Sequence, residues 1–317
     1  MVSVIIPCYN SFQWMERCIA ALERQTYRSF EVIVVDDAST DGSYESLVEL
    51  AVSFPLQVIR LEENHGPGHA RNVGIEAASG NWIAFCDADD WYADDFIEKM
   101  TRAAFKDEAD LVICDNSHDY ADGKTELLHK LDVFSGNPSK EELLALQEPS
   151  LCRLLIKRDL FDGVRLPESY HAEDVATAPV LMSRSSRVSL IREPLYHYFL
   201  REGSASRAPS LDAYKSFVSA FLAVEKELAL SYPVACEYRG VDIVLYGATL
   251  NAVKAGVDSS AVLEVINGFV IRYPQWKRNK YVGKLGIRKR IYLAFVDNRM
   301  ILPLRFYALL HRWAQRF

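Results

Sequence analysis

The first 115 residues alternate short apolar runs with longer segments of helical spacing. The runs are rich in Val, Ile and Phe, and they occupy residues 2–7, 30–36, 56–61, 81–87 and 110–115. Runs of this length without polar alternation are typical of strands that are buried on both faces of a mostly parallel sheet. The pattern therefore predicts five strands in one sheet.

The segments between these runs predict helices. Residues 12–25 carry Trp14, Cys18 and Leu22 at helical spacing after a cap at Ser11, residues 41–43 open a second helix, and residues 67–78 form a third. This is the order of a doubly wound α/β domain. Further on, residues 120–149 are polar and rich in turn formers, which predicts a surface excursion. A mixed region follows over 151–207, and 211–271 are predicted to be helical.

Composition narrows the class of protein. With 317 residues, 50% of them apolar and 25% charged, the chain has the profile of a soluble globular protein. It has no run of about 18 apolar residues, and its first residues lack the basic flank of a signal peptide, so we expect it to begin within the fold. Six cysteines without close pairing are expected to be buried, reduced thiols in a cytoplasmic protein.

Charge is distributed unevenly along the chain. The net charge is −7, but residues 272–317 hold twelve Lys or Arg and one acid, Asp297. Aromatic and aliphatic residues alternate with these bases, which is typical of a segment that lies on an anionic membrane. The alternative is a pair of amphipathic helices that pack on the domain or on another copy of the chain. Such a tail could also attract nucleic acid, a partner we do not expect for this protein.

Polar residues follow three of the predicted strands. They lie at 7–10, 36–41 and 87–90, and the carboxyl ends of parallel strands meet at one edge of a sheet. Clustered carboxylates there would raise one another's pKa unless a cation bound, and Mg²⁺ or Mn²⁺ suits carboxylate ligands. We predict Asp87 and Asp89 as ligands, with Asp90 behind them. The alternative is a solvated turn with an Asp cap on the next helix.

A glycine-rich turn at 64–72 leads into a helix that carries Arg71, an arrangement suited to a diphosphate. Arg71 could instead pair with Glu76 at the surface. Two other nucleotide-binding classes are disfavoured. The first strand is not followed by G-x-G-x-x-G, as a dinucleotide oxidoreductase requires, and the P-loop sequence G-x-x-x-x-G-K-[ST] occurs nowhere in the chain.

Four ordered motifs, at residues 4–10, 34–42, 66–74 and 85–90, together resemble the family 2 glycosyltransferases. The resemblance covers residues 1 to about 207. It implies the GT-A nucleotide-diphospho-sugar transferase fold, an α/β fold with a doubly wound, mostly parallel sheet, and inverting transfer. We expect a nucleotide-sugar-binding half at 1–115, an acceptor-binding half at 116–210, and a helical C-terminal extension at 211–317 that ends in the basic tail 272–317.

The resemblance also implies roles for single residues. Around the nucleotide it places Pro7, Tyr9 and Asp37, with Asn10 and Asp36 nearby. Arg71 resembles the family's donor contact. Asp87 and Asp89 resemble its metal-binding acids, and Asp89 would be the direct ligand to Mn²⁺ or Mg²⁺. Asp90 would be a sugar-binding acid.

The second half resembles the family at two places. Residues 170–175 are similar to the motif that supplies the catalytic base, so we predict Asp174 as the base and Glu173 as its substitute; they could instead be acids that favour a helix N-terminus. Residues 196–206 resemble the family's closing segment, a basic loop that folds over the donor phosphates. There Arg201 would hold phosphate, His197 is either a third metal ligand or a core histidine, and Ser204 and Ser206 are ordinary turn residues. Phe199 stands where the family usually has arginine.

The expected reaction moves one sugar from a nucleotide-diphospho-sugar, with UDP as the usual family nucleotide, to a hydroxyl of a glycan or lipid-linked acceptor. Polymerising relatives carry Gln-x-x-Arg-Trp, and here Leu309 stands at the Gln position before Arg312 and Trp313. We expect a role in cell-surface polysaccharide synthesis, in the cytoplasm or at the inner face of its membrane. Self-association through the C-terminal helices stays open. The alternative functions are a non-catalytic nucleotide-sugar sensor or scaffold, and a nucleotidyltransferase, which is disfavoured because it would need a Gly- and Lys-rich loop after the first strand.

Overall fold

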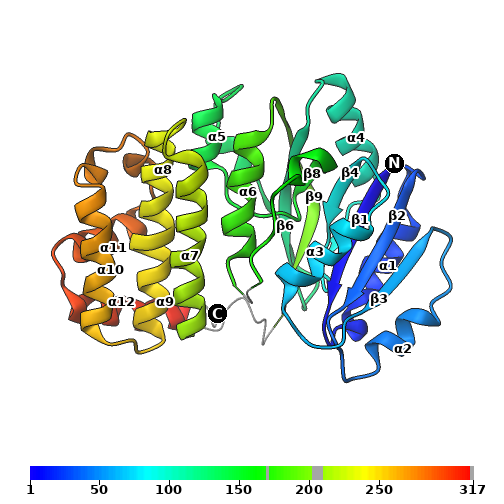
Figure 1. The fold of residues 1–317 in the computed structure, drawn as a ribbon, viewed down its shortest axis with the longest axis horizontal. Helices are drawn as coiled ribbons and strands as arrows, with labels where there is room; N and C mark the ends of the chain where they lie inside the picture. The colour runs from blue at the N-terminus through cyan, green and yellow to red at the C-terminus, as the bar shows by residue number, and fades with distance from the viewer. Residues whose placement is uncertain (169–170, 202–209, 315–317) are drawn as a thin grey trace. The chain divides into compact units, whose positions relative to one another are not determined.

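The computed structural model describes residues 1–168, 171–201 and 210–314 (Figure 1). The chain divides into two compact units. Unit 1 comprises residues 1–137 and 148–204, and unit 2 comprises residues 138–147 and 205–317. The short segment 138–147 thus belongs with the C-terminal helices rather than with the sheet that precedes it in sequence.

Unit 1 begins with the predicted parallel strands. They pair in the order β3-β2-β1-β4, and their bounds are β1 Val2–Cys8, β2 Phe30–Asp36, β3 Leu56–Arg60 and β4 Trp82–Phe85. Strands β1, β2 and β4 are almost wholly buried, as their continuous apolar sequence requires. This half of the predicted fold is confirmed.

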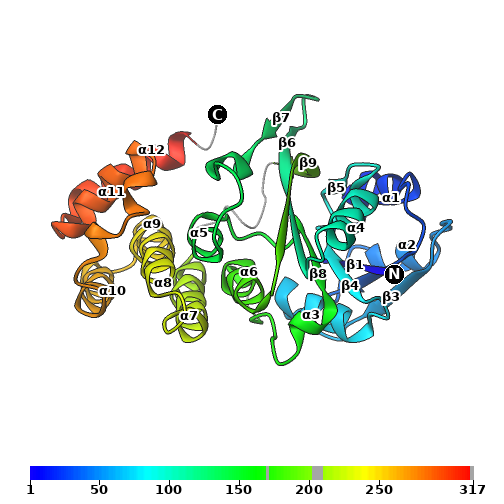
Figure 2. The same cartoon turned by 90° about the horizontal axis from the view of Figure 1, so that it is seen from above.

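Helices cover both faces of these strands. In Figure 2, α3 lies on one face and α1 on the opposite face, as right-handed crossovers in a doubly wound sheet require. The expected helix over 12–25 is split into a 3₁₀ turn and α1, and it ends before Gln25, whose side-chain amide donates to the Ala93 carbonyl at 2.7 Å. The bounds are η1 Phe12–Trp14, α1 Met15–Glu23, α2 Ser43–Val48 and α3 Pro67–Ala77.

The rest of unit 1 extends the sheet with mixed strand directions. Strand β8 is antiparallel to β4 and β6, while β9 runs parallel to β6 and antiparallel to β5. The run expected to end at Asp115 continues to Tyr120. The bounds are β5 Trp91–Tyr92, β6 Leu111–Tyr120, β7 Thr125–Leu128, β8 Leu154–Lys157 and β9 Val188–Leu200, with α4 Phe96–Lys106, η2 Lys130–Val133, η3 Arg158–Phe161 and α6 Glu173–Arg184.

The segment 120–149 is more structured than a surface excursion. It contains β7, the 3₁₀ turn η2 with buried Leu131, and α5 Lys140–Leu146. A capping box starts α5, because the Ser139 hydroxyl accepts from the Glu142 N–H and the Glu142 carboxylate accepts from the Ser139 N–H. The turn-forming residues around this helix concealed its signal.

Unit 2 is built from helices. Helices α8 and α9 are continuous through the π-helix η5, and Figure 1 shows them between α7 and α10. The buried Arg239 joins α5 to this group, because its guanidinium donates to the Leu144 and Gln147 carbonyls. The bounds are α7 Leu211–Leu228, α8 Pro233–Gly240, η5 Val241–Ala248, α9 Thr249–Lys254, α10 Ser259–Arg272, η6 Trp276–Arg278, η7 Val282–Lys284, α11 Ile287–Asp297 and α12 Ile301–Ala314.

Two further features match the composition. All six cysteines are buried and free of disulfides, as expected, and burial raises the pKa of the Cys8 thiol to about 12. Within the part of the chain that the structure describes, no helix combines the length and apolarity needed to cross a membrane.

Candidate active site

The turns after β1 and β2 are tied together by side-chain hydrogen bonds. Asn10 takes a left-handed backbone conformation, its N–H donates to the Ser39 hydroxyl at 2.9 Å, and its side-chain oxygen accepts from the Thr40 N–H at 2.9 Å. Pro7 is the next-to-last residue of β1, and the side chain of Tyr9, just after the strand, is about half exposed. The structure thus brings the strand-end residues Pro7, Tyr9 and Asn10 to one edge of the sheet, as expected.

The two acids after β2 are buried for different structural reasons. Asp36 accepts from the Ser39 N–H at 3.2 Å and lies 3.9 Å from the Arg60 guanidinium, while its second oxygen has no hydrogen-bond partner among the described residues. Asp37 accepts from the N–H groups of His65 at 2.9 Å and Gly66 at 2.7 Å. Asp37 therefore fastens the turn after β2 to the loop that starts α3.

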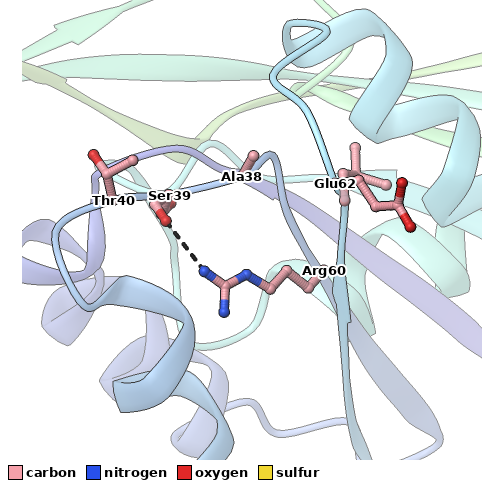
Figure 3. A pocket seen from close by; sticks show the side chains of 6 residues that line it. Ala38, Ser39, Thr40, Arg60 and Glu62 are labelled. Carbon is pink, nitrogen blue, oxygen red and sulfur yellow. Dashed lines mark hydrogen bonds between the residues drawn. The ribbon is translucent and has the colours of Figure 1, made fainter.

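A hollow of about 500 Å³ lies beside these turns (Figure 3). Arg60 crosses it, with its guanidinium 3.5 Å from the Ser39 carbonyl oxygen and 4.6 Å from the centre of the Tyr44 ring. None of its lining residues was predicted to contact the nucleotide. Its walls are formed by Ala38, Ser39, Thr40, Arg60, Leu61 and Glu62.

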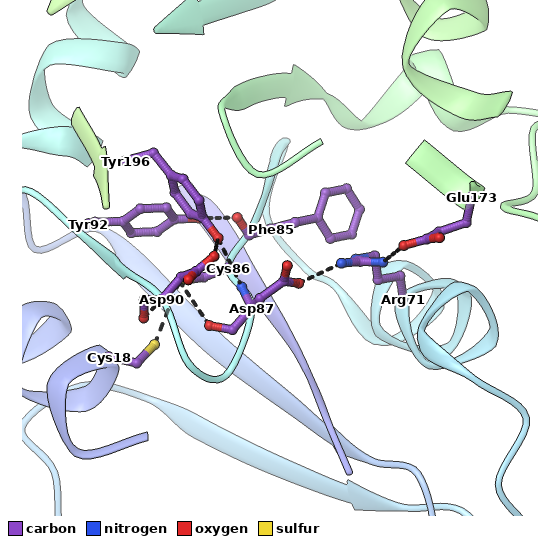
Figure 4. A network of polar contacts seen from close by, with 9 residues as sticks. All are labelled: Cys18, Arg71, Phe85, Cys86, Asp87, Asp90, Tyr92, Glu173 and Tyr196. Carbon is purple, nitrogen blue, oxygen red and sulfur yellow. Dashed lines mark hydrogen bonds and ion pairs between the residues drawn. The ribbon is translucent and has the colours of Figure 1, made fainter. Parts of the chain in front are cut away.

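Arg71 lies at one side of the polar network drawn in Figure 4, between Asp87 and Glu173. Its guanidinium is almost fully buried and donates to Asp87 at 2.6 Å and to Glu173 at 2.7 Å. Burial alone would lower the pKa of Arg71, but the charges of Asp87 and Glu173 outweigh it and raise that pKa. The alternative pairing with Glu76 is not observed, since Glu76 pairs with Arg165. Arg71 thus joins the turn after β4 to the start of α6.

The other acids of the β4 turn have separate partners. Asp89 forms an ion pair with Arg201 at 2.6 Å. Burial and the nearby Asp87 carboxylate raise the pKa of Asp89, although Arg201 opposes the shift. Asp90 is fully buried and accepts from the Tyr196 hydroxyl and from the Phe199 N–H at 2.8 Å, so it fastens the turn to β9.

Glu173 and Asp174 begin α6, after Ala172 in the left-handed conformation. Asp174 accepts from the Val175 N–H at 2.7 Å. Desolvation of its carboxyl group, together with the neighbouring Glu173 carboxylate, raises the pKa of Asp174 to about 7. A carboxyl group with this pKa can exchange protons near neutral pH.

His197 lies in a polar cluster that sequence reasoning missed. Its Nδ1 atom is 2.9 Å from the Ser117 hydroxyl and 3.1 Å from the Asp119 carboxylate, and its ring stacks on Trp91 at 5.3 Å between centres. Ser117 and Asp119 lie on β6, two residues apart on one face, but nothing in the sequence indicated that β6 pairs with β9. Only Nε2 of His197 is left for a metal.

Arg201 also contacts an aromatic residue, because its guanidinium lies 5.4 Å from the Trp14 ring centre.

Ser204 and Ser206 lie outside the described residues, as does Tyr170 of the motif before α6. Within the described ranges, no group of three or more His, Cys, Asp or Glu side chains is arranged to hold a metal ion. Asp87 and Asp89 thus share one turn, with Arg71 and Arg201 as their counterions.

The fold resembles that of solved glycosyltransferases. Staphylococcus aureus TarS 1–349, solved in complex with UDP-GlcNAc, superposes with a TM-score of 0.73 at 19% identity, over 99% of this chain and 92% of that one. The mannosyltransferase PcManGT from Pyrobaculum calidifontis, in complex with GDP-Man and Mn²⁺, gives a TM-score of 0.60 at 19% identity, over 94% and 86% of the two chains. The predicted GT-A fold with C-terminal helices is confirmed.

Sequence comparison gives the family. The putative glycosyltransferase EpsH of Bacillus subtilis (strain 168) is 34% identical over 62% of this chain, and the matched region spans 60% of EpsH. The minor teichoic acid biosynthesis protein GgaB of the same organism is 28% identical over 68% of this chain, but over only 25% of GgaB. The family described as "Glycosyl transferase family 2" matches residues 3–163. The chain belongs to this family.

Proposed function

We propose that this chain is a glycosyltransferase that moves one sugar from a nucleotide-diphospho-sugar to a hydroxyl of a glycan or lipid-linked acceptor, with inversion and with a divalent metal. One observation carries the proposal: the buried guanidinium of Arg71 joins Asp87, after β4, to Glu173, next to Asp174. Acids from the two proposed halves, donor-binding and acceptor-binding, therefore meet around one cation, which supports a site that handles both substrates.

The donor would bind along the turns after β1 and β2. The half-exposed ring of Tyr9 offers an apolar face to the base, between Pro7 and Asn10. Asp36 and Asp37 would face the ribose, and both oxygens of Asp37 keep a second lone pair beside the N–H bonds they already accept. UDP is the proposed nucleotide, with support from the UDP-GlcNAc bound to TarS.

The turn after β4 has the chemistry of a site for Mn²⁺ or Mg²⁺. Carboxylate oxygens suit these ions, and the raised pKa of Asp89 means that its ionised form gains from an added cation. We propose that Asp87 and Asp89 hold the ion, with Asp90 as a positioning group behind them. His197 is not included, because no group of three such side chains among the described residues is arranged to hold a metal ion. When bound, such an ion offsets negative charge on the phosphates of the donor.

Separate residues of the chain would then carry the separate parts of the transfer reaction. Asp174 takes the proton of the acceptor hydroxyl while that oxygen attacks the anomeric carbon, and the bond from that carbon to the diphosphate breaks in the same step. Arg71 and Arg201 would stabilise the charge of the departing diphosphate. Glu173 would keep Arg71 in place, and it is the substitute base if Asp174 is not.

A thermal-shift titration with UDP tests the donor and the metal together. A ligand that binds only the folded protein raises the melting temperature, so UDP with Mn²⁺ should stabilise the chain more than UDP alone. Asp89→Asn should remove the increment that depends on Mn²⁺. Asp159→Asn removes an exposed acid of η3 and should keep that increment. Equal increments in both variants would refute the metal site.

A second assay separates the enzyme from a nucleotide-sugar sensor. The enzyme releases UDP from a UDP-sugar when an acceptor or water is present, whereas a sensor binds the donor without turnover. We also propose that the acceptor is lipid-linked and that the reaction takes place at the inner face of the cytoplasmic membrane. The name of GgaB, a teichoic acid biosynthesis protein, supports an acceptor that belongs to a cell-envelope polymer.

A further inference from the structure

Helix α12 has two apolar faces. Leu304 and Ala308 are buried, so this face fixes the helix within unit 2. Leu302, Phe306 and Leu309 lie at spacings of four and three residues on the other side, and 77%, 64% and 63% of these side chains are exposed. The packing of unit 2 accounts for the first face and leaves the second without a partner among the described residues.

Helix α11 also carries exposed apolar residues. Ile287 and Ile291 are one turn apart and exposed, whereas Tyr292 is buried against Tyr246 of η5, with 5.2 Å between ring centres. Tyr292 also contacts Tyr307 of α12 at 4.9 Å, so the two helices are neighbours. Figure 2 shows α11 and α12 along one side of helices α7 to α10. We call the exposed set the tail face: Ile287, Ile291, Leu302, Phe306, Leu309 and Leu310.

The segment that forms the tail face has an excess of positive charge, although Arg272, Lys280 and Lys289 pair with acids of other elements. Residues 272–317 contain twelve bases and Asp297 as their only acid, and that acid already pairs with Lys277 at 3.0 Å. Arg288 and Arg290 are exposed on α11, and Arg305 is exposed on α12 beside Phe306. A partner that covers this surface must therefore accept apolar side chains and supply negative charge.

We propose that the tail face docks on an anionic lipid bilayer. Its apolar side chains would enter the boundary between headgroups and acyl chains, while the arginines pair with lipid phosphates. A second copy of the chain fits less well, because two copies of this surface would bring like charges together. Nucleic acid would pair with the arginines but leave Leu302, Leu309 and Leu310 in water. The inference rests on the lipid-linked acceptor proposed above and names the surface that would meet its membrane.

Vesicle sedimentation of the full chain tests the proposal. The protein should bind vesicles of phosphatidylglycerol and phosphatidylcholine, bind pure phosphatidylcholine far less, and lose binding as salt is raised. Phe306→Ser with Leu309→Ser should lower the partition coefficient at least tenfold. Arg288→Gln with Arg290→Gln should lower it about tenfold in low salt.

The control variant removes two other exposed apolar residues, which lie elsewhere in unit 2. Leu222 is 54% exposed and Leu230 is 86% exposed, so Leu222→Ser with Leu230→Ser changes overall hydrophobicity in the same way. It should bind vesicles like the unchanged chain. Unchanged UDP binding in every variant would show that the fold is intact and would separate a failure of docking from a failure of the proposed transferase activity.

Three results would overturn the inference. The chain fails to bind anionic vesicles; or the control variant loses binding as much as the tail-face variant; or the tail-face variant turns a dimer into a monomer, while neither form binds lipid. The last result would assign the tail face to a second copy of the chain.

Discussion

The candidate active site of unit 1 and the tail of unit 2 hold arginines in different environments. In unit 1, Arg71 is buried and donates to Asp87 and Glu173, and Arg201 pairs with Asp89. On the tail of unit 2, Arg288 and Arg290 are exposed among exposed apolar side chains. Buried charges must be balanced within the protein, so a ligand that enters unit 1 has to bring matching charges of its own. Exposed arginines beside apolar groups are free to meet an extended surface.

Of the substitutions that test this contrast, Asp174→Asn should have the largest effect on activity. Asparagine keeps the shape of the side chain but cannot take the proton of the acceptor, so we expect kcat to fall about 10²- to 10⁴-fold. UDP binding and vesicle binding should stay near those of the unchanged chain. Steady-state transfer assays measure kcat, calorimetry measures UDP binding, and sedimentation measures vesicle binding. A variant with normal kcat would show that Asp174 is not the base, and Glu173→Gln would be tested next.

Arg71→Lys should have the next largest effect. The two carboxylates bound by Arg71 need the fork of a guanidinium, and a lysine ammonium on a flexible stem cannot reproduce both contacts. We expect kcat/KM to fall roughly 10- to 100-fold. Arg165→Lys is the matched control, because Arg165 pairs with Glu76 at the surface, where exchange should cost little. Equal losses in both variants would contradict a special role for Arg71.

The pH dependence of the rate should be a smaller effect with a defined sign. The base works only when deprotonated, and burial beside Glu173 raises the pKa of Asp174 to about 7. The rate should therefore rise with pH through about 7 and level off above it, with about a tenfold loss for each pH unit well below that value. The residual activity of Asp174→Asn should lack this rise. A profile for the unchanged chain that is flat between pH 5 and 8 would contradict the assignment.

Ser139→Ala should have the smallest effect, and it acts on unit 2 alone. It removes half of the capping box that starts α5, which should cost about 1 kcal/mol of stability. The melting temperature should fall by a few degrees while kcat stays unchanged. A loss of kcat without a change in melting temperature would show that unit 2 supports catalysis directly rather than through its own stability.

Local signals explain which parts of the fold were predictable. The strands β1, β2 and β4 are mainly apolar runs, and the chain direction places their carboxyl ends at one edge, so the turns around Asp37 and Asp87 could be grouped without a structure. The strand β6 was predicted too short, because its polar residues Asp115, Asn116 and Ser117 look like a turn although they are buried in the sheet. Helix α5 was not predicted, because turn-forming residues surround it, although Ser139 and Glu142 have the spacing of a capping box.

For the site, the sequence identified which residues to expect but not how they pair. The motifs pointed to Arg71, Asp87, Asp89 and Asp174, whereas the partner of Arg71 depends on α6, about a hundred residues further along the chain. The cluster of His197 with Ser117 and Asp119 likewise depends on the pairing of β6 with β9. Contacts between segments so distant in sequence leave no local periodicity from which they can be predicted.

The sequence by itself determined the parallel sheet, the acidic turns at its edge, the family and the basic, amphipathic tail, because hydrophobic spacing and short motifs act within a few residues. The tertiary structure alone decided that Asp37 holds a loop, that Asp90 is buried under Tyr196, and which face of α12 is left exposed. These outcomes follow from how distant segments pack together, because each buried charge needs a partner and the packing decides which face of a surface helix is buried.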